Sequence, residues 1–117
     1  ENEVVLLDME AGVEHFGRGV DNSVDLILMI VDPSFESLKL TKKIQQLGES
    51  IGKTVFFVLN KVNELVLPTM LESIDDQSKV LAVISTDTEI ARKGLVGDEL
   101  MMEIPEIHTL ARKILKQ

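Results

Sequence analysis

Thr54-Val-Phe-Phe-Val-Leu59 is a continuous run of apolar residues, with no polar residue after Thr54. Three further runs of the same kind follow the pattern: Val4-Val-Leu-Leu-Asp8, Leu26-Ile-Leu-Met-Ile-Val31 and Val80-Leu-Ala-Val-Ile84. A strand with one face in water alternates apolar and polar side chains, whereas a strand that is covered on both faces is continuously apolar. These four segments therefore predict buried strands of a mostly parallel sheet that is covered by helices.

The segments between the last three runs are long enough for crossover helices. Residues 36–47 place apolar side chains on one stripe and lysines on the other side, and Gly48 predicts the end of this helix. Residues 63–74 form a second helical pattern, which Asn63 can cap and in which Pro68 predicts a boundary or a kink. A final helix is predicted from Pro105, and a short one over residues 89–93.

The apolar stripes that these helices should bury are Leu40, Ile44 and Leu47; Val66, Met70 and Ile74; and Ile107, Leu110, Ala111, Ile114 and Leu115. Strands that alternate with helices in this way predict an α/β fold in three layers. Residues 1–117 are expected to form one domain of this Rossmann-like class.

Composition narrows the class of protein. Hydrophobic residues make up 44% and charged residues 27%, which is typical of a globular chain. The net charge of −8 disfavours nucleic acid as a partner, because a polyanion would be repelled. The absence of cysteine excludes disulfides and thiolate metal sites and fits a cytoplasmic protein. No apolar run approaches the roughly 20 residues of a membrane span, so none is expected.

Polar residues follow the predicted strands, where ligands of parallel α/β sheets collect. The first run ends in Asp8-Met-Glu-Ala-Gly12. An aspartate at the end of a buried strand can reach a Mg²⁺ ion directly or through its water shell, so Asp8 is a candidate catalytic and metal residue. Glu10 could influence an attacking water, and the backbone amide of Gly12 could approach a γ-phosphate. The alternative that Asp8 only caps a following helix is equally open.

Asn60-Lys61 follows the third run and has the composition of a loop that reads a nucleotide base. An amide there can bind the purine while the lysine stem packs on it. A guanine reader of the Asn-Lys-x-Asp type needs a carboxylate at the fourth position, where this chain has Asn63. Adenine is therefore the favoured base, and a helix cap is an equally open role for Asn63.

The string Leu7-Asp-Met-Glu-Ala-Gly-Val-Glu-His-Phe-Gly-Arg-Gly19 resembles the switch region of the carbon monoxide dehydrogenase accessory ATPases, which support nickel insertion. Three short motifs follow in the order expected for that family: Val31-Asp-Pro-Ser, Asn60-Lys-Val and Ser85-Thr-Asp. That family is similar to the ParA and MinD group of P-loop ATPases, which bind ATP and Mg²⁺ between two subunits. The resemblance covers nearly all of this chain but only the later part of a family member.

The resemblance implies roles for individual residues. Asp8 would be the switch aspartate near Mg²⁺, bound through water, and Gly12 would approach the γ-phosphate. Asn60, with Lys61 beside it, would contact adenine, and the segment from Ser85 to Asp87 would line the base pocket. A subunit interface would contain Glu14, His15 and Arg18. The implied partners are a second copy of the chain, as a homo-oligomer, and a metalloenzyme client.

Two features of the family are missing from the 117 residues: a Gly-rich Lys-Ser/Thr phosphate loop and a Cys-x-Cys pair. We therefore expect this chain to be the C-terminal part of such an ATPase. Without the phosphate loop it should neither bind ATP tightly nor hydrolyse it. The alternative function is a non-enzymatic α/β regulatory or protein-interaction module.

Overall fold

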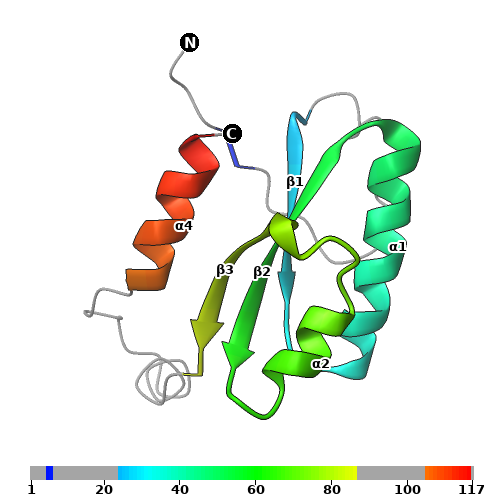
Figure 1. Ribbon diagram of the computed structural model, residues 1–117. Helices are drawn as coiled ribbons and strands as arrows, with labels where there is room; N and C mark the ends of the chain where they lie inside the picture. Colours follow the sequence, from blue (N-terminus) through cyan, green and yellow to red (C-terminus); the bar gives the residue numbers. More distant parts are fainter. Residues whose placement is uncertain (1–4, 7–23, 87–104, 117) are drawn as a thin grey trace, which may run out of the picture.

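The computed structural model describes residues 5–6, 24–86 and 105–116 (Figure 1). Its centre is an all-parallel sheet of three strands in the order β1-β2-β3. The strands are β1 (Leu26–Val31), β2 (Thr54–Val62) and β3 (Val80–Ser85). Helix α1 (Phe35–Ile51) connects β1 to β2, and α2 (Leu67–Glu72) with the short 3₁₀ helix η3 (Gln77–Lys79) connects β2 to β3. The predicted α/β class with a parallel sheet is confirmed.

The predicted strands differ from the structure at three places. The run at 26–31 coincides with β1, and the run at 80–84 extends by one residue to Ser85. The run at 54–59 extends to Val62, three residues further than predicted. In the run at 4–8, the two described residues lie in no strand and are largely exposed, Val5 by 78% and Leu6 by 82%. The strand prediction is wrong for these two residues, and the other residues of that run lie outside the described part.

Strand β2 lies between β1 and β3, and this central position explains why its residues 55–59 are continuously apolar. Five consecutive residues of β2, from 55 to 59, are buried. Val55, Phe57 and Leu59 belong to the cluster that also includes Ile44 of α1. The residues between them point to the opposite face of the sheet and are also buried, Phe56 among them, with the Lys79 ammonium group 5.2 Å from the centre of its ring.

Helix α1 has well-formed ends, but it does not stop where glycine predicts. Ser34 caps its N-terminus by accepting a hydrogen bond from Ser37 N, and Gly52 ends it in the left-handed conformation with φ of 70°. Gly48 lies inside the helix and is buried. A Cβ atom at Gly48 would lie 2.5 Å from Val55 Cγ2, so glycine is needed there because the helix approaches β2 closely. The predicted helix end at Gly48 is therefore wrong.

Helix α2 begins later than predicted. Asn63 Oδ1 accepts hydrogen bonds from the backbone amides of Leu65 and Val66, which shapes a turn before the helix. Pro68 then lies in the first helical turn, so the predicted boundary is confirmed. Met70 and Ile74, from the predicted stripe, are both buried.

Hydrogen bonds join α1 to the end of α2. The buried Thr41 hydroxyl lies 2.6 Å from Leu38 O in its own helix and 3.1 Å from Ser73 O beyond α2. The Gln45 amide donates to Ser73 O at 3.3 Å and accepts from Asp75 N at 3.0 Å. Lys42 of α1 forms an ion pair with Asp75 as well. The two crossover connections are therefore held against each other by polar contacts as well as by the apolar core.

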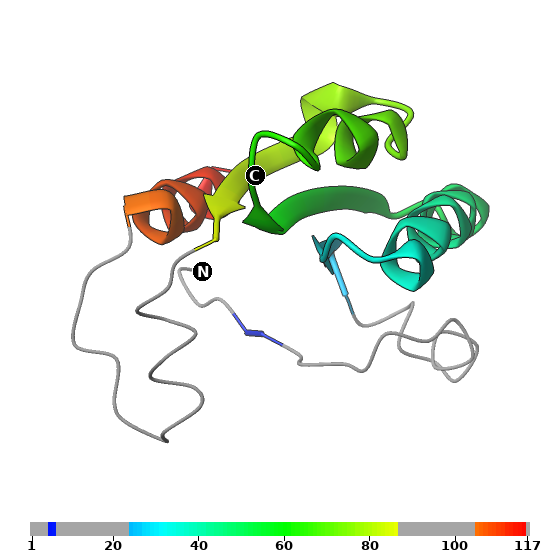
Figure 2. The same cartoon turned by 90° about the horizontal axis from the view of Figure 1, so that it is seen from below.

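Helix α4 (Pro105–Leu115) lies beside β3, at the end of the sheet opposite to β1 (Figures 1 and 2). Its start at Pro105 agrees with the prediction. Lys113 Nζ donates a hydrogen bond to Leu81 O of β3 at 2.7 Å. Within the predicted stripe only Leu110 and Ile114 are half-buried, whereas Ile107 and Leu115 are 47% and 69% exposed. The buried stripe of α4 is thus narrower than predicted, and the predicted short helix at 89–93 lies outside the described residues.

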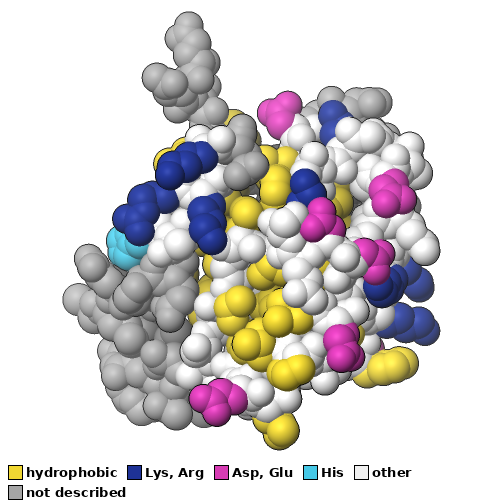
Figure 3. Space-filling model, viewed as in Figure 1, with side chains coloured by type: hydrophobic (Ala, Val, Ile, Leu, Met, Phe, Trp, Pro, Cys, Tyr) yellow, Lys and Arg dark blue, Asp and Glu magenta, His cyan; other side chains and the backbone are white. Residues whose placement is uncertain are grey.

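Basic side chains gather over α4 and on the outer side of α1 (Figure 3). Lys39, Lys42 and Lys43 of α1 are exposed, as predicted. Among the helices that the structure describes, none combines the length and the apolar character needed to cross a membrane.

Candidate functional site

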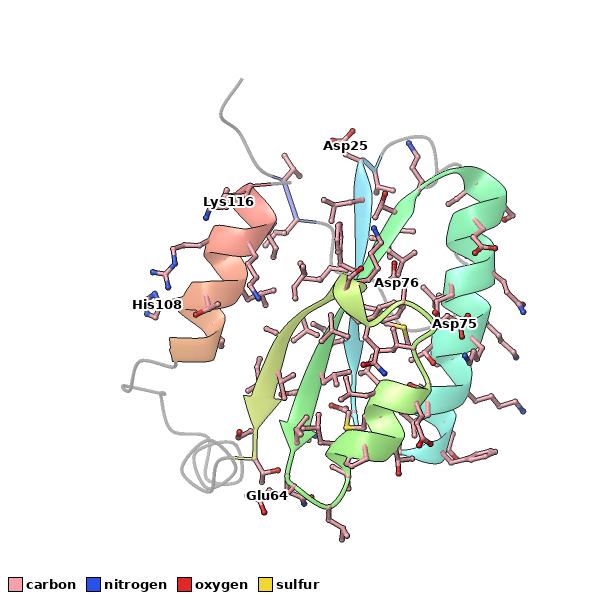
Figure 4. The ribbon with its side chains drawn as sticks, in the orientation of Figure 1. Asp25, Glu64, Asp75, Asp76, His108 and Lys116 are labelled. Atoms are coloured by element: carbon pink, nitrogen blue, oxygen red, sulfur yellow. The ribbon has the colours of Figure 1, made fainter. Side chains whose placement is uncertain are left out.

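The candidate site is the edge of the sheet where the three parallel strands end. Strands that run in the same direction bring their carboxyl ends to one edge, so the residues that follow them meet there. The turn after β2 lies at this edge, as the position of Glu64 shows (Figure 4). Asp32 follows β1, Asn60 and Lys61 lie near the end of β2, and Ser85 ends β3.

The Asp32 carboxylate contacts two side chains of β2 at this edge. The Asn60 side-chain amide lies 3.4 Å from Asp32 Oδ1, and the Lys61 ammonium nitrogen lies 4.0 Å from Asp32 Oδ2. Each carboxylate oxygen therefore has its own partner from β2. The side chains of Asp32 and Lys61 are 46% and 67% exposed, so the group remains accessible to a ligand.

The backbone of Asp32 is fixed by the start of α1. Its amide donates to Ser37 Oγ at 3.0 Å, and its carbonyl accepts from Ser34 N at 2.8 Å. Ser34 Oγ in turn accepts from Ser37 N at 3.1 Å. The capping residues of α1 thus place the carboxylate, because the strand ends directly in the helix cap.

Asn60 and Lys61 lie inside β2 and not after it, which corrects the sequence prediction. Leu59 pairs with Val83 and Val62 pairs with Ser85, so two residues of β2 stand opposite a single residue of β3. This is the arrangement of a β-bulge, which re-aims side chains next to functional sites. Lys61 has φ of 55°, the left-handed conformation that residues other than glycine seldom adopt. The sequence could not show that β2 continues through Asn60 and Lys61, because the bulge depends on pairing with β3.

Ser85 lies at the same edge as Asn60 and Lys61. It pairs with Val62 at the end of the sheet and is exposed, and Thr86 N donates to Val62 O at 2.9 Å just beyond it. Three of the predicted site residues are therefore brought to one edge. The others, Asp8, Glu10, Gly12 and Asp87, lie outside the described residues, so their roles stay predictions.

Asn63 caps the turn before α2 through two hydrogen bonds to backbone amides. The predicted helix cap at Asn63 is therefore wrong, because the N-cap of α2 is Val66, which makes no side-chain cap hydrogen bond, and Asn63 serves the turn before it. The Asn63 carbonyl also accepts from Leu67 N at 3.1 Å. Asn63 thus has a complete structural role at the start of the β2–β3 connection.

Sequence reasoning missed the part that Asp32 plays. The segment Asp32-Pro-Ser34 is visible in the sequence as a polar strand end, but nothing local assigns it a role. The available signal is that an acidic residue directly after β1 must lie beside Asn60 if β1 and β2 are parallel neighbours. Strand order is not evident from the sequence, so the pairing could not be inferred.

A Mg²⁺ site cannot be assembled from the described residues alone. In residues 5–6, 24–86 and 105–116, no three His, Cys, Asp or Glu side chains gather as a metal would require. The groups at the edge are an amide, an ammonium, a hydroxyl and a carboxylate, which suit a base and its hydrogen-bonding groups. Asp8, the predicted Mg²⁺ residue, is not among the described ones.

Comparison with known proteins finds relatives that are named for ATP binding or for carbon monoxide dehydrogenase. An ATP-binding protein of Methanocaldococcus jannaschii is 45% identical over 116 residues, which is 99% of this chain and 46% of that protein. A second ATP-binding protein of that organism is 32% identical over 87% of this chain and 41% of its own length. The carbon monoxide dehydrogenase accessory protein CooC of Rhodospirillum rubrum is 38% identical over 81% of this chain and 36% of its own length.

This chain is a homologue of these ATP-binding proteins and of the accessory protein CooC. The resemblance that begins in the Leu7 to Gly19 string is thereby confirmed, and the parallel α/β sheet agrees with a partial P-loop ATPase fold. The chain spans less than half the length of each of these relatives. No family model matches it.

Proposed function

We propose that this homologue of the accessory proteins forms the base-binding part of a MgATP-dependent ATPase that supports nickel insertion into carbon monoxide dehydrogenase. Two relatives are named ATP-binding proteins, and one is named a carbon monoxide dehydrogenase accessory protein. The 117 residues contain no phosphate loop, so the chain by itself turns over no ATP.

The observation that carries the proposal is the contact of Asp32 with Asn60 and Lys61 at the carboxyl edge of the sheet. Asn60 presents an amide, which can both donate to a purine and accept from it. The Lys61 stem is long enough to pack on the base, and Ser85 offers a hydroxyl at the neighbouring strand end. These are the groups expected of a nucleotide-base site in this class of sheet.

The catalytic half of the proposal rests on the segment before β1. Asp8 would hold Mg²⁺ through its water shell, and Glu10 would orient the attacking water. Gly12 would let the backbone approach the γ-phosphate, while Asp87 would complete the base pocket with Ser85. The metal ion would supply neutralisation of charge on the phosphates.

The proposed partners are a second copy of the chain and a metalloenzyme client in the cytoplasm. Within the described sheet β1 is an edge strand, and Ile30 on it is 52% exposed. An apolar edge strand favours association with another element, which supports an oligomer. The net charge of −8 argues against nucleic acid as a partner.

Calorimetric titration of MgATP tests the proposal. The full-length gene product should bind MgATP and hydrolyse it, and the 117-residue chain should do neither. Asn60→Ala in the full-length product should weaken binding, whereas Asp75→Ala, which removes only an exposed ion pair with Lys42, should not. Failure of the full-length product to bind MgATP would contradict the proposal and favour the non-enzymatic interaction module.

A further inference from the structure

We propose that Asp32 is a positioning residue for the Asn60 amide and thereby sets the preference for adenine over a 6-oxopurine. This inference rests on the proposed function, because it assumes that Asn60 contacts the base. It goes further by assigning a role to Asp32, and it makes that role measurable apart from ATP binding itself.

The first step concerns the orientation of the amide. A carboxylate accepts hydrogen bonds and donates none, so the atom of Asn60 that faces Asp32 has to be the NH₂ group. Asn60 Nδ2 lies 3.4 Å from Asp32 Oδ1. With the nitrogen held toward Asp32, the carbonyl oxygen of the same amide points away from the carboxylate. Asp32 thus decides which end of the amide is presented to a ligand.

The second step concerns the rigidity of Asp32. Its main chain is fixed on both sides by hydrogen bonds to Ser34 and Ser37 at the cap of α1. Its other carboxylate oxygen lies 4.0 Å from the Lys61 ammonium group. The backbone of Lys61 lies in the bulge, where its φ is 55°, and its side chain is 67% exposed. The main chain of Asp32 is therefore placed by the start of α1, and its carboxylate contacts side chains of β2.

The third step concerns the base. Adenine carries an amino group at position 6, which donates, whereas hypoxanthine and guanine carry an oxygen there, which accepts. An amide that presents its oxygen accepts from the adenine amino group and is repelled by the oxygen of a 6-oxopurine. An amide that is free to turn over can serve either base. Loss of Asp32 should therefore reduce the preference for adenine more than it reduces the affinity for ATP.

The variants separate orientation from charge. Asp32→Ala removes the acceptor and frees the amide. Asp32→Asn offers either an oxygen or an NH₂ group to Asn60, so its preference should be intermediate. Lys61→Ala removes the ion pair but keeps the Asp32 carboxylate as the acceptor for Asn60, so it should lower the affinities for ATP and ITP by the same factor. Asp75→Ala is the matched surface control, because Asp75 pairs with Lys42 on the α1 side of the molecule.

The experiment measures the affinities of the full-length gene product for MgATP and MgITP, whose bases differ in the group at position 6 and in the proton that hypoxanthine carries at N1. Asp32→Ala should lower the ratio of the two affinities about fivefold, the value of roughly one hydrogen bond. In an Asn60→Ala background the same change should leave the ratio as it is, because no amide remains to be oriented. Rescue toward the wild-type ratio by Asp32→Asn would support orientation over a general loss of structure.

Two outcomes would overturn the inference. If wild type binds MgATP in preference to MgITP and Asp32→Ala keeps that preference, Asp32 does not position the amide, although the proposed function stands. If wild type binds neither nucleotide, the proposed function fails and the inference fails with it.

Discussion

Replacement of Gly48 by alanine tests how closely α1 approaches β2. The added Cβ would lie 2.5 Å from Val55 Cγ2 and 3.0 Å from the carbonyl oxygen of Lys53. Both neighbours resist displacement, since Val55 is buried and β-branched and the Lys53 atom belongs to the backbone. Either the side chain or the helix therefore has to move.

The magnitude follows from two opposing effects. Alanine is favoured over glycine inside a helix by about 1 kcal/mol. Overpacking of a core commonly costs about 1–3 kcal/mol, and contacts this short place Gly48→Ala in the upper part of that range. The expected net result is a loss of about 1–2 kcal/mol in the free energy of unfolding.

Urea denaturation of the 117-residue chain, followed by far-UV circular dichroism, measures this loss. Val55→Ala is the matched background, because it removes the Cγ2 atom that causes the shorter contact. Gly48→Ala should cost less in Val55→Ala than in wild type, and the difference is the coupling between the two positions. A Gly48→Ala protein as stable as wild type, or more stable, would refute the reasoning and restore Gly48 as an ordinary helix position.

Two further outcomes are expected. Asn63→Ala removes the side-chain acceptor for the amides of Leu65 and Val66 in the turn before α2, and should lower the free energy of unfolding by about 1 kcal/mol, measured in the same urea titration. The Ser78 hydroxyl, followed by the Ser78 backbone amide, lowers the pKa of Asp76 below its ordinary value. This contribution to stability is therefore present above the unfolded-state pKa and is lost as the pH falls through the folded-state pKa. Asp76→Asn should flatten the acid limb of a stability-against-pH curve, and an unchanged limb would contradict the assignment.

The strands could be predicted from the sequence because a short, continuously apolar run indicates a strand locally. Residues 26–31 and 80–84 do form strands, but their predicted burial is wrong for most of their residues: only three of these side chains are buried and Ile30 is 52% exposed, whereas β2 is buried throughout residues 55–59. The first run failed at Val5 and Leu6, which are apolar but lie in no described strand. Apolar character alone was therefore not sufficient to predict a strand at these two residues.

Glycine shows why helix ends were harder to predict than helices. Gly48 and Gly52 are only four residues apart, and either could end α1 by its chemistry. The structure uses Gly52 for its left-handed conformation and Gly48 for its lack of a side chain against β2. These two uses of glycine cannot be told apart until the distance between helix and strand is known.

The candidate site could be predicted only as far as strand ends are visible in the sequence. Asn60, Lys61 and Ser85 were identified because they terminate apolar runs, and the structure brings them to one edge. The bulge at Lys61 and the contact from Asp32 to Asn60 both depend on which strands are neighbours. Side-chain partners between strands therefore had to wait for the structure.

The hydrogen bonds of Thr41 and Gln45 have a mechanical consequence. Because the Thr41 and Gln45 side chains of α1 both donate hydrogen bonds to Ser73 O, the connection between β2 and β3 cannot shift unless α1 moves with it. The cap of α1 carries Asp32, and that connection begins at the turn after Asn60. A displacement of α1 or of the connection between β2 and β3 would therefore move Asp32 and Asn60 together, so that the distance between these two residues is kept.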